Sequence, residues 1–146
     1  MTDLVLSVGE NLLIIFNIIL SALIGLLMGF ERKRRGKTAG IRTFSLICLG
    51  ACVFTMLSLS AFKTDDTARI AAQIVTGIGF LGAGVIWRGG EGEYTIHGIT
   101  TAADMWVSAA IGMAIGTEQY VMAVATTVVV MIILNIHTKT EVMTKK

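Results

Sequence analysis

The chain contains five long apolar stretches, at residues 11–30, 43–62, 70–87, 99–116 and 119–137. A helix that crosses the hydrocarbon core of a bilayer needs about 20 consecutive, mostly apolar residues. Charged residues make up only 15% of the chain and hydrophobic residues 54%, which is unlike an ordinary soluble domain. We therefore expect an all-α integral membrane protein with about five transmembrane helices. The whole chain, 1–146, should form a single transmembrane domain.

Lysine and arginine are unevenly divided among the segments that connect these stretches. With five spans, the loops after the first and third stretches lie on the same side of the membrane as the C-terminal tail. These segments hold ten of the basic residues, whereas the loop between the second and third stretches holds two. Because cytoplasmic loops are enriched in Lys and Arg, the sequence predicts an N-terminus outside and a C-terminus in the cytoplasm.

Small residues recur at helical spacing in the first and third stretches. The first carries the ladder Asn17, Ser21, Gly25 and Gly29. In the third, one face of the helix carries Ala72, Thr76, Gly79 and Ala83, and roughly the opposite face carries Gly77 and Gly84. Small residues let membrane helices approach closely. We expect these two helices to occupy the middle of the bundle or a subunit interface, and we expect the protein to form a homodimer.

The fourth stretch carries a carboxylate, Asp104, inside an apolar helix. Thr100, Asp104 and Ser108 follow at intervals of four, with Thr101 beside them, and so form a polar stripe. A carboxylate in a spanning helix is costly, so it usually faces a partner, a cavity or a transported species. The sequence therefore predicts a polar or ion site around these side chains.

The predicted topology places other charged residues at the depth of Asp104. Glu31 ends the first stretch, Arg42 precedes the second and Arg88 follows the third, all at cytoplasmic helix ends. We expect Asp104 to face the protein interior, with Glu31 and either Arg42 or Arg88 close to it. Two interpretations stay open here, a structural ion pair and a site for an ion or a proton.

Other functional classes have little support in the sequence. Cys48 and Cys52 are the only cysteines, so no thiolate metal site is predicted. The histidines, His97 and His137, are isolated, and no nucleophile has a recognisable helper, so we expect no enzyme. The basic run 32–37 predicts topology and attraction to anionic lipid rather than nucleic-acid binding. We expect no cofactor, although binding of Mg²⁺ or another cation stays an open alternative.

Three motifs in this order resemble the membrane domain of the bacterial MgtC/SapB family. The first is Gly29, Glu31, Arg32, Arg34 and Arg35, followed by Gly40, Arg42 and Thr43. The second is GIGFLGAG at 77–84. The third is Gly98, Thr100, Thr101, Ala102 and Ala103 with Trp106, then Ala109, Ala110, Ile111 and Gly112.

The resemblance implies a multi-pass inner-membrane protein of about five helices. The resemblance also implies membership of a family that is associated with growth in low magnesium and survival inside host cells. Members of that family have been described as modulators of other membrane systems. The chain ends soon after the fifth stretch, so we expect no soluble C-terminal domain of the kind found in longer relatives. Our leading hypothesis is a regulator of magnesium- or acid-linked membrane physiology that acts through partner membrane proteins. The alternative is a small ion or proton transporter or channel, formed by a homo-oligomer, with a polar site at Asp104.

The topology can be tested with single cysteines in a chain whose two native cysteines have been replaced. A cysteine in the 63–69 loop should react with a membrane-impermeant maleimide in intact cells, because this loop is predicted to lie outside. Cysteines at positions 33 and 144 should react only after the membrane is opened. The opposite labelling pattern would overturn the predicted orientation.

Overall fold

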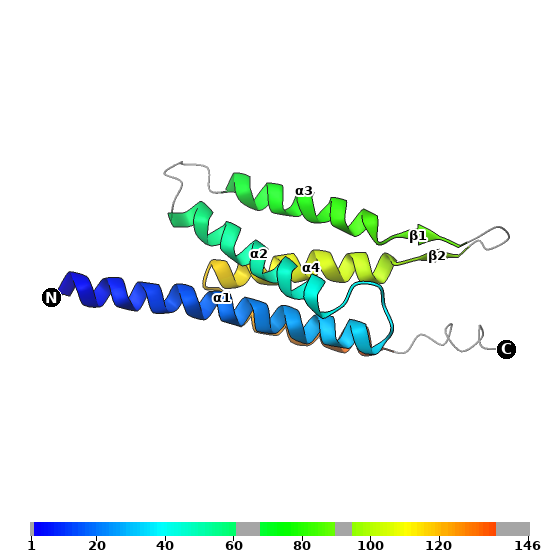
Figure 1. Ribbon diagram of the computed structural model, residues 1–146, viewed down its shortest axis with the longest axis horizontal. Coiled ribbons are helices and arrows are strands. Elements are labelled where there is room, and N and C mark those ends of the chain that lie inside the picture. Colours follow the sequence, from blue (N-terminus) through cyan, green and yellow to red (C-terminus); the bar gives the residue numbers. More distant parts are fainter. Residues whose placement is uncertain (1, 61–67, 90–94, 137–146) are drawn as a thin grey trace.

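The structure, a computed structural model, describes residues 2–60, 68–89 and 95–136, with side chains from residue 8 onward. The all-α expectation is confirmed: the described residues form the five helices α1 (Thr2–Arg34), α2 (Ile41–Ser60), α3 (Ala68–Gly84), α4 (Ile99–Gly116) and α5 (Tyr120–Asn135). A short antiparallel pair of strands, β1 (Trp87–Arg88) and β2 (Ile96–His97), joins α3 to α4. Figure 1 shows α1 to α4 running along the long axis of the molecule, with the N-terminal part of α1 projecting past the other helices.

The surface of the helices fits a hydrocarbon environment. Large apolar side chains lie outside, among them Val121 (85% exposed) and Phe80 (81% exposed). By length and composition, α1, α2 and α4 can each cross a membrane, whereas α3 and α5 are apolar but shorter, at 17 and 16 residues. The chain is thus a helical membrane protein. The count of five crossings and the orientation stay predictions, and residues 61–67 and 137–146, including His137, lie outside the described residues.

Several helix boundaries differ from those expected from the apolar stretches, and α1 already begins at Thr2 rather than at residue 11. Two of these differences bear on the candidate site. The first helix runs through Arg34, so the basic residues 32–34 belong to its last turn rather than to a loop. The third helix ends at Gly84, and Trp87 lies in β1, where its ring stacks on that of His97 with the centroids 4.4 Å apart. Hydropathy marks which residues are apolar, whereas a helix can continue through polar residues because its backbone hydrogen bonds are internal.

The core of the bundle is formed where α2 lies between α1 and α4. Both neighbours turn glycines toward α2: Gly25 and Gly29 on α1, and Gly112 and Gly116 on α4. A Cβ atom at Gly25 would lie 2.6 Å from the carbonyl oxygen of Phe44, and one at Gly116 would lie 2.7 Å from that of Cys52. No side chain fits at such distances, so the backbones of α1 and α4 approach that of α2 directly.

The third helix lies at the edge of the bundle and packs mainly on α4. Its buried side presents Gly82 to Ala102 of α4. The connection back to α4 turns at Gly98, whose φ of 89° and closeness to the backbone of Val85 both require glycine. The small residues of its two predicted faces are all exposed, namely Ala72, Thr76, Gly79, Ala83, Gly77 and Gly84. The expectation that this helix lies in the middle of one bundle is therefore wrong, and its alternative, a subunit interface, stays a prediction.

A matched pair of glycine substitutions tests the backbone contacts of α2. Gly112→Ala should lower the stability of the folded protein by about 1–3 kcal/mol, because the added methyl group must displace the backbone of α2. Gly50→Ala is the control, since a Cβ atom there meets nothing within 4 Å. It should be neutral or slightly stabilising, because alanine favours helices. Thermal unfolding in detergent measures both, and equal melting temperatures would contradict the close contact.

Candidate functional site

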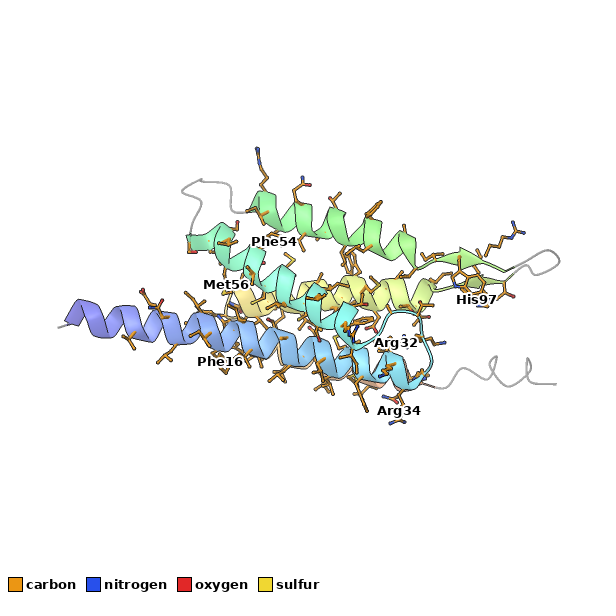
Figure 2. The ribbon with its side chains drawn as sticks, viewed as in Figure 1. Phe16, Arg32, Arg34, Phe54, Met56 and His97 are labelled. Carbon is orange, nitrogen blue, oxygen red and sulfur yellow. The ribbon has the colours of Figure 1, made fainter. Side chains whose placement is uncertain are left out.

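A buried arginine, Arg32, lies between two carboxylates at the C-terminal end of α1. Its Nε atom donates a hydrogen bond to Oε2 of Glu31 at 3.0 Å and lies 3.6 Å from Oδ2 of Asp104 on α4. The side chains of Arg32 and Asp104 are only 2% and 1% exposed. Figure 2 shows Arg32 directed into the bundle, whereas Arg34 points away from it. The cluster therefore joins the end of α1 to the first half of α4 inside the protein.

The helical register of α1 brings Arg32 to this position. Five buried residues of α1 follow one another at intervals of three or four: Asn17, Ser21, Gly25, Met28 and Arg32. On α4, Asp104 shares its buried side with Thr101 and Ser108. The hydroxyl of Ser108 donates to the sulfur of Met28 at 3.6 Å, so the two buried faces are in contact one turn away from the ion pair.

The charges of the cluster balance, but several of its hydrogen-bond donors and acceptors have no partner among the described residues. Glu31 also forms an ion pair with Arg35, so two cations meet two carboxylates. The distance of 3.6 Å between Arg32 and Asp104 is an ionic contact that is too long for a hydrogen bond. Within the described residues, neither carboxylate oxygen of Asp104 has a hydrogen-bond partner, and the Nη1 atom of Arg32 has none either. Asp104 thus keeps acceptor capacity that a proton or a cation could use.

The structure brings together only part of the predicted site. Glu31, Thr101, Asp104 and Ser108 are buried, whereas Thr100, in the first turn of α4, is exposed. The cation beside Asp104 is Arg32, where the sequence pattern predicted Arg42 or Arg88. Arg42 is exposed at the start of α2, and Arg88 is exposed in β1, beyond the end of α3. Arg42 thus lies at the expected helix end and Arg88 beyond it, and both side chains lie at the surface.

Two features of α1 were not predicted. Arg32 was assigned to a loop, although the ladder of Asn17, Ser21 and Gly25 continues to it at helical spacing. The second feature is a hydrogen bond of 2.9 Å from the hydroxyl of Tyr120 to Oδ1 of Asn17, which ties α5 to α1. No pattern in the sequence links residues so far apart, but a polar residue on the buried side of an apolar helix does call for a partner.

Comparison with known proteins gives a consistent result. The model of the MgtC family matches residues 18–143. Protein MgtC of Salmonella typhimurium (strain LT2) is 45% identical over 117 residues, which are 80% of this chain and 49% of that protein. "Putative magnesium transporter YhiD" of Escherichia coli K12 is 42% identical over 130 residues, 84% of this chain and 59% of that protein. The chain thus spans about half the length of these curated relatives, and no solved structure matches it.

The contribution of the buried ion pair can be measured by a mutant cycle. Arg32→Met should lower the free energy of unfolding by about 3–5 kcal/mol, because it leaves the Asp104 carboxylate buried beside Glu31 without its cation. The double variant Arg32→Met with Asp104→Leu should recover most of this loss, since it removes both charges. Arg34→Met, which changes an exposed neighbour, should shift it by less than about 0.5 kcal/mol.

Unfolding in detergent, followed by circular dichroism, measures all three variants. If Arg32→Met and Arg34→Met destabilise the protein equally, the pair between α1 and α4 does not hold the fold. If the double variant is as unstable as Arg32→Met, the loss comes from packing rather than from the unpaired charge of the buried Asp104 carboxylate.

Proposed function

The chain belongs to the MgtC family, and from this premise we propose that it is a non-enzymatic protein of the bacterial inner membrane that regulates magnesium- or acid-linked physiology by binding other membrane proteins. The observation that carries the proposal is the exposed small-residue face of α3, formed by Ala72, Thr76, Gly79 and Ala83. One relative is named for magnesium transport, which supports the link to magnesium.

The small-residue face of α3 is suited to contact with another helix. Its four residues lie on one side of the helix, and a Cβ atom added at Gly79 meets nothing within 4 Å. Helices associate in membranes through such faces, because short side chains let the backbones come close enough for packing and weak hydrogen bonds. A lipid tail that lies against a glycine does not form a comparable close contact between two backbones. A helix of a partner protein, or α3 of a second copy in a homodimer, would complete the packing that one chain leaves open.

The ion-pair cluster gives this surface a rigid support. The Arg32–Asp104 contact and the glycines facing α2 hold α1, α2 and α4 together, and α3 packs on α4. A rigid face can discriminate between partners, because a mismatch cannot be relieved by movement of the helix. In this function Asp104 is a structural residue. Asp104→Asn should then lower thermal stability, and activity should follow the amount of folded protein.

The second candidate is transport, and one observation favours it. Both oxygens of Asp104 are buried without a hydrogen bond among the described residues, as expected of a carboxylate that binds a proton or a cation transiently. In this case Asp104→Asn should leave the fold intact and remove the function. The two candidates therefore differ in whether activity and stability change together.

The partner-binding function predicts an effect of bulk on the exposed face of α3. In a strain that depends on this protein for growth in low magnesium, Gly79→Leu should abolish growth while the amount of folded protein stays unchanged, because leucine blocks close approach of a second helix. Val121→Leu, at an 85% exposed position on α5, is the control and should grow normally. A photo-reactive residue at position 76 should crosslink to a membrane protein or a second copy, and one at position 121 should not.

Flux measurements distinguish the transport candidate. Liposomes that contain the purified wild-type protein should show no Mg²⁺ or proton flux under an imposed gradient. A selective flux that Asp104→Ala removes would overturn the regulatory proposal in favour of transport. Normal growth of the Gly79→Leu strain would also count against it, since the exposed face would then have no role.

A further inference from the structure

A long apolar groove runs between α2 and α3, on the side of α3 opposite its small-residue face. Its volume is about 860 Å³, and its lining includes Leu46, Phe54 and Leu57 of α2, Ile74 and Leu81 of α3, and Ala109 of α4. The groove exists because α3 packs mainly on α4 and touches α2 little. Figure 1 shows α2 running at an angle to α3.

The walls of the groove are open to the surroundings of the protein. Leu46 is 66% exposed, Phe54 57% and Leu81 49%. Contact with an apolar group stabilises these branched and aromatic side chains. In a bilayer that group is a hydrocarbon chain, unless another protein fills the groove.

The two walls of the groove are formed mainly by branched and aromatic side chains, with Leu46, Phe54 and Leu57 on α2 and Ile70, Ile74 and Leu81 on α3. Surfaces that receive membrane helices are rich in small residues instead. The groove therefore suits a flexible hydrocarbon chain, which can follow an uneven lining.

One end of the groove is polar and positively charged. Arg42 and Thr43 line it where α2 begins, at the same end of the bundle as the end of α3. Arg42 is exposed, and no described residue forms a hydrogen bond or ion pair with it. A guanidinium group binds phosphate oxygens through two parallel hydrogen bonds. Arg42 is therefore placed to hold an anionic head group at the mouth of an apolar channel.

We propose that the groove between α2 and α3 is a binding site for an anionic phospholipid of the surrounding bilayer. One acyl chain lies along Leu46, Phe54 and Leu81, and the phosphate group contacts the guanidinium of Arg42. Basic pockets between membrane helices bind anionic head groups in this way, and each cation near such a head group favours it about fivefold over a neutral one. The site is separate from the ion-pair cluster and from the small-residue face of α3, so it does not depend on the function proposed above.

Native mass spectrometry of the purified full chain tests this site. The protein is released from nanodiscs that contain equal amounts of phosphatidylglycerol and phosphatidylcholine, and bound lipids are counted. The wild-type protein should retain phosphatidylglycerol about fivefold more than phosphatidylcholine. Arg42→Gln should bring this ratio close to one, because it removes the cation. Arg34→Gln removes an exposed cation far from the groove and should keep the wild-type ratio.

A second variant tests the apolar part of the site. Gly77 lines the groove and has open space at its Cβ position, so Gly77→Phe should fill the channel and lower retention of both lipids. Its melting temperature should match the wild type, which separates loss of binding from loss of fold. Three outcomes would overturn the proposal. The lipid ratio could be the same for the wild type and Arg42→Gln, or it could fall equally for Arg42→Gln and Arg34→Gln. The protein could also retain a second copy of the chain in place of lipid.

Discussion

The direct backbone contact of α2 with both of its neighbours determines the rest of the structure. Gly25 on α1 and Gly112 on α4 leave no room for a side chain, so three helices meet at the shortest distance that their backbones allow. Membrane helices gain little from exclusion of water, and close packing supplies the attraction instead. The same contact fixes the register in which Arg32 meets Asp104. A buried ion pair can persist there because packing holds its two helices in place.

The predictable part of the candidate site follows from local periodicity. Asp104 and Ser108 lie on one buried side of α4 because residues four apart share a face, and an apolar helix must hide its polar groups. The identity of the cation could not be read from the sequence in the same way. Positive charges at the end of a membrane helix have many solvated positions open to them, and only the extra turn of α1 carries Arg32 inward. Whether a helix stops before or after a basic run depends on what covers its last turn.

The position of α3 illustrates a different limit. Its two small-residue faces are visible in the sequence, but periodicity does not say which face meets the same chain. The structure uses Gly82, which lies between the two faces, against Ala102, and leaves Gly79 exposed. The strand pair at Trp87 and His97 was missed because alternation over two residues carries no signal. Local patterns therefore predicted the elements, and long-range packing decided how they were used.

The unequal lengths of the helices have a consequence for the bilayer itself. At 1.5 Å per residue, α1 with its 33 residues is roughly 50 Å long, whereas α3 with 17 and α5 with 16 are roughly 25 Å long. The hydrocarbon core of a bilayer is about 30 Å thick. Where α3 crosses it at the edge of the bundle, the membrane becomes thinner beside this helix, while α1 tilts or extends into the head groups. The protein would thus impose a locally thin region on its lipid annulus, and neighbours with short transmembrane segments would be the ones drawn to it.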